Sequence, residues 1–213
     1  MPPANPGDPT ETVTRARAEV VPRDRVGGPG NPPPRKRLKA KICLVGDGPV
    51  GKTSLVRRYV LNMYDDRYIA TIGTKVSRKE IQVPQPADRP VTVDLLIWDI
   101  MGQDKFRDIL RDAYFRGVSG VLAVCDMTRR RSLERLESWM GAVESVAGEV
   151  ATLVALNKAD LEEAAEFGED EAGQIAEAFG GEVLATSART GSHVEEAFRL
   201  LATSVVTRAL HSA

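Results

Sequence analysis

The 213-residue sequence predicts an α/β fold, in which helices cover both faces of a mostly parallel β-sheet. Two observations predict this fold. From residue 39 onward, short apolar runs typical of buried strands alternate with stretches of helical periodicity. Apolar residues make up 42% of the chain and charged residues 28%, as in an ordinary globular domain. The chain is therefore long enough to form one domain with a full hydrophobic core.

The first part of the domain predicts a strand, a helix and a hairpin. Residues 40–46 form an apolar run that ends in glycine, and residues 51–64 continue with helical spacing. The next two strand-like runs flank a turn-rich segment, which predicts an antiparallel hairpin; the runs are 76–83 and 91–100.

The second part predicts three more buried strands, each followed by a helix. The strands are 120–127, 151–157 and 181–188, and the helices are 131–146, 170–180 and 192–209. Ligands of such sheets bind at the carboxyl ends of the strands, so the motifs that follow these strands are expected at one edge.

Residues 1–38 predict a disordered, Pro-rich and basic tail that precedes a domain spanning residues 39–209. The segment 1–39 holds eight Lys and Arg against four Asp and Glu. Its basic end is either a solvated linker or a weak contact with an anionic membrane or acidic partner. A third reading, in which the tail binds nucleic acid, is the weakest, so no nucleic-acid partner is expected.

The chain carries no targeting or anchoring signal that we recognise. Its N-terminus lacks the apolar stretch of a secretory signal, and its last residues contain no cysteine for prenylation. Cys43 and Cys125 lie inside apolar runs and are expected to be buried small hydrophobes in a reducing compartment. We therefore expect a cytoplasmic protein without a lipid anchor.

The run GDGPVGKT fits the phosphate-binding pattern GxxxxGK[ST] between a predicted strand and a helix. Gly46 and Gly51 allow the loop to bend so that backbone N–H groups face phosphate oxygens. The Lys52 ammonium is expected to reach the β- and γ-phosphates, and the Thr53 hydroxyl suits Mg²⁺.

The run NKAD at 157–160 selects guanine over adenine. The carboxylate of Asp160 is expected to accept the two adjacent donors of guanine, and the stem of Lys158 to lie along the base. Asn157 is expected to tie this loop to the phosphate loop. Ser187 and Ala188 follow the last strand, where a backbone N–H is expected to meet the guanine oxygen.

Two further segments predict metal binding and hydrolysis. Asp99 ends a strand and is expected to hold Mg²⁺ through a water, while the N–H of Gly102 approaches the γ-phosphate. Gln103 is then placed to orient the attacking water. Thr71 is expected to reach Mg²⁺ and the γ-phosphate only when GTP is bound, which makes residues 64–76 a switch.

These motifs resemble those of the Ras superfamily of small GTPases, and most of all its Rab-like branch. The resemblance rests on GDGPVGKT, YIATIGT, WDIMGQ, NKAD and TSARTGSHVEEAF, and it covers residues 39 to about 209. It implies a P-loop NTPase small G-domain with a six-stranded sheet and five helices. It also implies that Tyr64 packs beside the base, that Tyr68 belongs to the first switch, and that Mg²⁺ assists a GTP/GDP cycle. Effectors, exchange factors and GTPase-activating proteins are then expected to bind residues 64–76 and 99–116.

Several residues depart from the pattern of the family. Ile100 and Met101 replace the usual Thr-Ala, so the second switch is expected to sit differently. Pro49 removes one backbone N–H from the phosphate loop. Val76 stands where Rab proteins usually have an aromatic effector-binding residue, although Trp98 is kept. With these departures the chain resembles a prokaryotic or archaeal member of the family.

The sequence thus predicts a Mg²⁺-dependent GTPase that acts as a molecular switch, with a nucleotide-gated scaffold of little or no hydrolysis as the alternative. The catalytic residues expected are Gln103, Lys52 and Thr71. The metal ligands expected are Thr53, Thr71 and Asp99. The nucleotide-binding residues expected are Gly46, Asp47, Gly48, Pro49, Val50, Gly51, Lys52, Thr53, Ser54, Tyr64, Tyr68, Thr71, Gly102, Asn157, Lys158, Asp160, Ser187 and Ala188.

Overall fold

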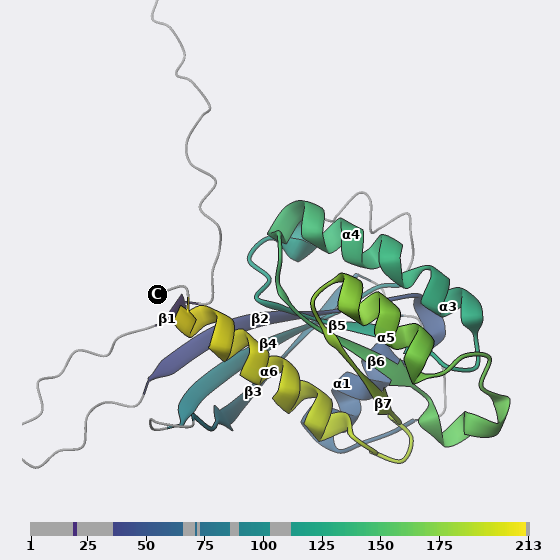
Figure 1. Ribbon diagram of the computed structural model, residues 1–213. Coiled ribbons are helices and arrows are strands. Elements are labelled where there is room, and N and C mark those ends of the chain that lie inside the picture. Colours follow the sequence, from purple (N-terminus) through teal and green to yellow (C-terminus); the bar gives the residue numbers. More distant parts are fainter. Residues whose placement is uncertain are drawn as a thin grey trace, which may run out of the picture.

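The structure is a computed structural model of the chain (Figure 1). It describes residues 19–20, 36–65, 71, 73–85, 90–102 and 112–211. Two of the predicted site residues, Tyr68 and Gln103, lie outside these ranges.

A twisted, mostly parallel sheet forms the centre of the domain, as the alternating pattern predicts. Its six main strands lie in the order β3-β4-β2-β5-β6-β7. The β3–β4 pair is antiparallel and forms the predicted hairpin, and the other neighbours on this path are parallel. The strands are β2 (Arg37–Val45), β3 (Thr74–Val83), β4 (Val91–Ile100), β5 (Gly120–Asp126), β6 (Ala151–Asn157) and β7 (Glu182–Thr186).

A short strand that the sequence does not predict extends this sheet. The two-residue strand β1 (Glu19–Val20) pairs antiparallel with β2 at Lys39 and Leu38. This part of β2 is open on that side because the pairing between β2 and β5 begins only at Ile42. An unpaired strand edge presents free backbone donors and acceptors, which β1 partly satisfies. Of the segment 1–38, the structure describes residues 19–20 and 36–38, of which 19–20 and 37–38 are in strands.

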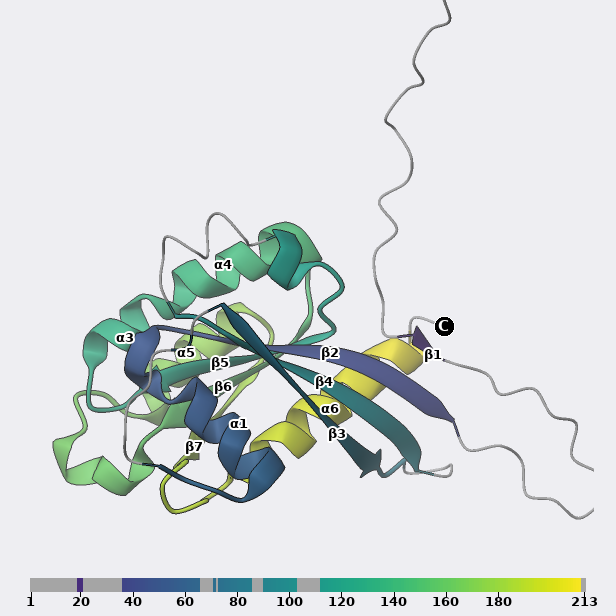
Figure 2. The ribbon, with the colours of Figure 1, turned by 180° about the vertical axis from the view of Figure 1, so that it is seen from behind.

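Helices cover both faces of the sheet, as predicted. In Figure 2, α4 lies above the sheet, while α1 and α6 lie below it. The predicted helix at 131–146 is two helices, α3 and α4, that meet at Arg135. The helix bounds are α1 (Lys52–Leu61), α3 (Arg130–Glu134), α4 (Leu136–Ala147), α5 (Glu169–Ala178) and α6 (Val194–His211).

Two hydrophobic cores hold the helices to the sheet. One joins α1 and α6 to the sheet, and in it the Tyr59 and Phe198 rings stack with centroids 3.9 Å apart. The other packs α3, α4 and α5 against the opposite face and contains Trp139. Cys43 and Cys125 are buried, as predicted, and burial raises the pKa of both thiols to about 12. None of the helices in the described ranges is long and apolar enough to span a membrane.

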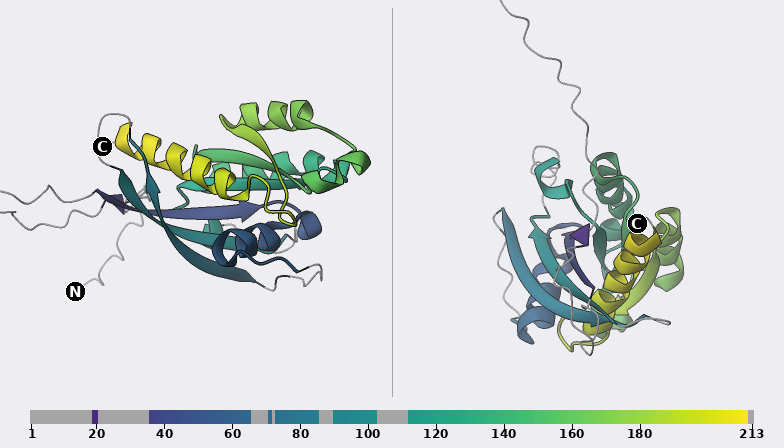
Figure 3. Two further views of the ribbon diagram at one scale, coloured as in Figure 1. Left: turned by 90° about the horizontal axis from the view of Figure 1, so that it is seen from below. Right: turned by 90° about the vertical axis from the view of Figure 1, so that its left-hand side faces the viewer.

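The carboxyl ends of the parallel strands meet at one edge, which positions the site. Figure 3 shows β1 and the end of α6 at the opposite end of the molecule. Two short 3₁₀ segments, η1 (Gly48–Val50) and η2 (Ala159–Ala164), lie in the loops that follow β2 and β6. The loops that carry the predicted motifs therefore share one end of the sheet.

Candidate nucleotide-binding site

The loop between β2 and α1 is folded so tightly that two of its positions admit only glycine. Gly46 has φ 129° and Gly51 has φ 100°, a region that other residues avoid. A Cβ atom on Gly46 would collide with the Val124 carbonyl, and one on Gly51 with the Asn157 side chain. Pro49 lies within η1, where its φ of −89° and ψ of 30° depart from helical values. The loop then leads directly into α1.

Lys52, the first residue of α1, is buried inside this loop. Its side chain is nearly inaccessible, with 3% of the residue exposed. Its Nζ donates hydrogen bonds to the carbonyls of Gly46 (2.6 Å) and Asp47 (2.5 Å). Burial lowers the pKa of Lys52 to about 8, against the opposing effect of the Asp99 and Asp47 carboxylates. A buried cation at a helix N-terminus is a site that favours a phosphate group.

Three oxygen-bearing side chains from three segments meet beside Lys52. The Thr53 hydroxyl donates to the Asp99 carboxylate at 2.5 Å and lies 2.9 Å from the Thr71 hydroxyl. Asp99 is 1% exposed, and its Oδ1 has no hydrogen-bond partner. Burial raises the pKa of Asp99, while the Thr53 hydrogen bond and the Lys52 charge act in the opposite direction. The structure thus brings together the three predicted metal ligands.

The residues of this cluster fit Mg²⁺. Hydroxyl and carboxylate oxygens are the ligands of hard cations, and Mg²⁺ takes only one or two carboxylates, with phosphates and waters completing its shell. Within the described part of the chain, no group of three or more His, Cys, Asp or Glu side chains forms another metal site. The buried, unpartnered Oδ1 of Asp99 is an acceptor that such an ion or its water would satisfy.

Gly102 brings the segment after β4 against the phosphate loop. A Cβ atom at Gly102 would collide with the backbone of Asp47 and come within 2.6 Å of the Gly48 nitrogen. Only glycine therefore permits this approach. Met101, which replaces a smaller residue of the family pattern, is buried at 6% exposure, and its N–H donates to Gly73 O at 3.2 Å. The bulky side chain is accommodated in the interior.

The loop after β6 is tied directly to the phosphate loop, as the sequence predicts. The Asn157 amide donates to the Val50 carbonyl at 2.8 Å. Its Oδ1 accepts the Ala188 N–H at 3.2 Å and the Thr186 hydroxyl at 3.3 Å. Asn157 is 1% exposed, so it joins the loops after β2, β6 and β7 from within. A backbone N–H of Ser187 or Ala188 is predicted to meet the guanine oxygen, and in this structure the Ala188 N–H contacts Asn157.

Asp160 and Ser187 also meet. The Ser187 hydroxyl donates to Asp160 Oδ1 at 2.5 Å, and Arg189 lies 3.9 Å from Oδ2. Tyr64, which follows α1, is 37% exposed, and the Arg58 guanidinium lies 5.9 Å from its ring centroid. Ser54 is half-buried in the first turn of α1.

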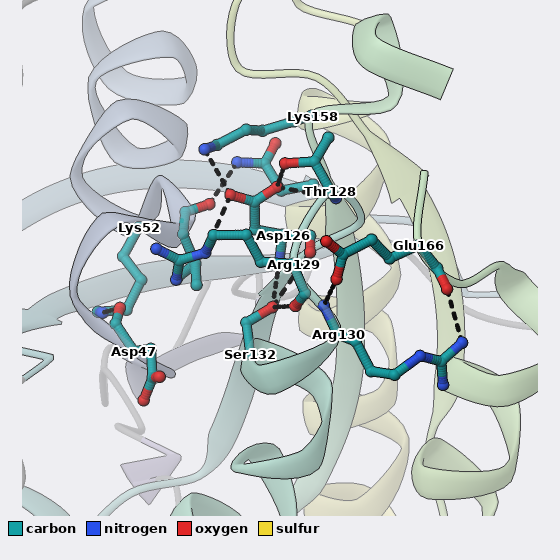
Figure 4. A network of polar contacts seen from close by, with 11 residues as sticks. Asp47, Lys52, Asp126, Thr128, Arg129, Arg130, Ser132, Lys158 and Glu166 are labelled. Carbon is teal, nitrogen blue, oxygen red and sulfur yellow. Dashed lines mark hydrogen bonds and ion pairs between the residues drawn. The ribbon is translucent and has the colours of Figure 1, made fainter. Parts of the chain in front are cut away.

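Asp126 is a buried carboxylate of the site that the sequence analysis missed (Figure 4). It is 0% exposed, and its Oδ2 lies 2.5 Å from the Lys158 ammonium and 3.5 Å from Arg129 Nε. Its Oδ1 accepts the hydroxyl (2.7 Å) and N–H (3.1 Å) of Thr128. Lys158 itself has φ 68°, so this ion pair holds a residue in an unusual backbone conformation. Asp126 is the last residue of β5 and Asp99 the last but one of β4, and this position at the carboxyl end of a strand was the signal that could have identified Asp126.

Asp47 anchors the phosphate loop to the junction between α3 and α4. Its Oδ1 accepts the Trp139 indole N–H at 3.3 Å and lies 3.2 Å from Arg135 Nε. The break between the two helices therefore coincides with a contact to the phosphate loop. Nothing in the spacing of Arg135 and Trp139 along the chain points to this loop.

The sequence is similar to known protein families over the same region. The family model described as Ras family matches residues 41–207. Rab-1 of Theileria parva is 35% identical over 164 residues, which are 76% of this chain and 72% of that protein. The GTP-binding protein ypt4 of Schizosaccharomyces pombe is 34% identical over 170 residues, covering 79% and 72% of the two chains. Rab-13 of Canis lupus familiaris is 32% identical over 167 residues, covering 78% and 79%.

Proposed function

We propose that this chain, which belongs to the Ras family of small GTPases and is Rab-like in sequence, hydrolyses Mg²⁺-bound GTP to GDP and phosphate. It would thereby act as a molecular switch. The GTP cycle would take place in the cytoplasm. One observation carries the proposal: the Asn157 amide bonds the Val50 carbonyl and thereby joins the base-reading loop to the phosphate loop. Lys52 and Asp160 then belong to one site that has a cation at one end and a carboxylate at the other.

The end of the site around Asp160, here called the base end, suits guanine. Asp160 is an acceptor for two adjacent donors, and its partners in this structure are the Ser187 hydroxyl and, at 3.9 Å, the Arg189 guanidinium. Lys158 is held by the buried Asp126, so its stem has a fixed direction. Tyr64 would pack beside the base, and Ser187 and Ala188 would line its oxygen edge. Adenine offers no matching pair of donors to Asp160, which is why the site would select GTP.

The end of the site around Lys52, here called the phosphate end, suits a triphosphate with Mg²⁺. Thr53 and Thr71 would hold the ion directly, and Asp99 through a water. The ion would supply neutralisation of the phosphate charge. Lys52 would exchange its two backbone carbonyl partners for phosphate oxygens. The backbone N–H groups of residues 46–54, except Pro49, which has none, would donate to the same oxygens.

Hydrolysis would rest on positioning by the chain's own residues. Gln103 would orient the attacking water, and the Gly102 N–H would donate to the γ-phosphate from its place against Asp47 and Gly48. The motifs themselves supply no clear arginine finger. The unaided reaction would therefore be slow, and an arginine from a partner would accelerate it by roughly 10³–10⁵.

The switch would consist of residues 64–76 and 99–116. Thr71 already contacts Thr53 through a hydroxyl pair, so the nucleotide state would be relayed to this segment at one contact. Effectors, exchange factors and GTPase-activating proteins would bind these two segments when they are ordered by GTP. Exposed apolar residues in this region, Tyr64 (37%) and Val76 (49%), are consistent with a protein-binding surface.

A second candidate function is a nucleotide-gated scaffold that binds GTP and turns it over little. It rests on Met101, whose side chain is larger than that of the residue it replaces. The burial of Met101 places its bulk in the interior, which favours the hydrolysing switch over the scaffold.

Single-turnover hydrolysis of bound GTP with Mg²⁺ distinguishes the two. We expect the wild type to convert GTP to GDP and Gln103→Leu to hydrolyse GTP at least about tenfold more slowly. The control Gln85→Leu, in the hairpin after β3, should hydrolyse GTP at the wild-type rate. Tight GTP binding without turnover, even when candidate activating proteins are added, would support the scaffold instead.

A further inference from the structure

Arg58, in the last turn of α1, contacts two sides of the base end. Its Nε donates to the Ala188 carbonyl at 2.9 Å, and its second terminal nitrogen donates to the Arg189 carbonyl at 2.5 Å. On its other side, the guanidinium lies 5.9 Å from the Tyr64 ring centroid, within the range of a cation–π contact. The segment after β7 and the segment after α1 are far apart in the sequence, and Arg58 joins them.

The shape of the guanidinium explains why arginine suits this position. Its planar fork donates to two acceptors at once, whereas a lysine ammonium is a point charge without this geometry. The two acceptors are consecutive carbonyls of a loop that turns at Gly191, where φ is 89°. The Arg58 stem packs beside that glycine, because a Cβ there would lie 3.6 Å from Arg58 Cδ. The loop is thus held by both hydrogen bonds and packing.

The same helix also begins at the phosphates. Lys52 is the first residue of α1 and Arg58 lies six residues later, a rise of about 9 Å along the helix axis. The end of the helix is fixed by Asn62, whose N–H bonds the carbonyls of Arg57 and Arg58. A single rigid element therefore connects the phosphate end of the site to its base end.

We infer that Arg58 is a positioning residue that holds the Ala188–Arg189 backbone and the Tyr64 ring as the two walls of the base site, and so slows nucleotide release. This inference rests on the proposed function. Because Arg58 contacts both walls, its displacement would loosen both. Phosphate chemistry lies at the other end of α1 and would be unaffected.

Dissociation of a fluorescent GDP analogue from Mg²⁺-bound protein tests the inference. We expect Arg58→Ala to release the analogue at least about tenfold faster, because two charge-assisted hydrogen bonds are lost. Arg58→Lys should restore only part of the difference, since it keeps the charge but not the fork. The control Arg57→Ala, on a neighbouring face of α1, should release at the wild-type rate. Single-turnover hydrolysis of GTP already bound should stay within about twofold of the wild type in all three variants.

A double-mutant cycle separates positioning from a general loss of stability. Tyr64→Phe keeps the ring and should release GDP nearly as slowly as the wild type, whereas Tyr64→Ala should release it faster. If Arg58 acts partly through this ring, Arg58→Ala should have a smaller effect in the Tyr64→Ala background. The inference would be overturned if the two substitutions had additive effects on the rate of GDP release. It would also be overturned if the rate of hydrolysis fell by as large a factor as the rate of release rose.

The outcomes also separate this inference from the function on which it rests. A wild-type protein that binds no guanine nucleotide would contradict the proposed function. A wild-type protein that binds GDP, with Arg58→Ala releasing it at an unchanged rate, would contradict the inference alone.

Discussion

The two ends of the site are built in different ways. The cradle of the phosphate end comes from one contiguous run, residues 46–53, in which glycine conformations and a helix start shape the loop. Thr71, Asp99 and Gly102 are added to this cradle from other segments. The base end is assembled from separate segments, with Asp126 at the end of β5, Lys158 and Asp160 after β6, and Ser187 after β7. A local motif thus forms one half, and tertiary packing forms the other.

The difference teaches which half of a site can be identified from sequence. In the phosphate loop, the residue types and their spacing dictate the backbone, because only glycine fits at positions 46 and 51. At the base end, each functional side chain depends on a partner from a distant strand, such as Asp126 for Lys158. If this contrast is correct, mutations at the two ends should have different consequences.

The largest effect is expected at the phosphate end. Lys52→Ala should weaken the binding of GDP and GTP at least about 100-fold, because the buried ammonium would donate charge-assisted hydrogen bonds to the phosphates. Isothermal titration calorimetry would measure the loss, and circular dichroism would verify that the fold is retained. A dissociation constant equal to that of the wild type would show that the loop is no phosphate cradle.

A smaller effect is expected from the tertiary support of the base end. Asp126→Asn keeps an acceptor for Thr128 but removes the charge that pairs with Lys158. It should therefore lower the affinity for GDP about tenfold. Arg129→Ala is the matched control, because Arg129 lies farther from the same carboxylate and is partly exposed, so it should change affinity little. Titration of both variants would measure this, and equal losses would indicate a general disturbance of the loop.

The sequence predicted the sheet and the local motifs well. The strand at 91–100 and the strand at 151–157 have the predicted bounds, because long apolar runs bounded by turn residues leave few alternatives. The predicted cluster of Thr53, Thr71 and Asp99 is present, since Thr53 lies at the start of α1, Asp99 near the end of β4 and Thr71 shortly before β3. The bond from Asn157 to Val50 is confirmed for the same reason.

The features that the sequence did not predict depend on tertiary contacts, which leave no local sequence pattern. The strand at Glu19–Val20 forms because β2 has an open edge there, and edge pairing satisfies backbone groups of almost any sequence. The roles of Arg58 and Arg135 depend on which loop the fold brings beside them. The division of the predicted helix at 131–146 into α3 and α4 also coincides with a tertiary contact, because the junction lies at Arg135 and Arg135 contacts Asp47.

The most direct test of the account is the base preference of Asp160→Asn. Competition against a fluorescent GDP analogue would give the affinities for GDP, XDP and ADP in the wild type and the variant. We predict that the wild type prefers GDP and that the variant loses GDP affinity while gaining XDP, because an amide in place of Asp160 donates to the extra oxygen of xanthine. An unchanged preference for GDP in the variant would contradict the account, since Asp160 would then not read the base.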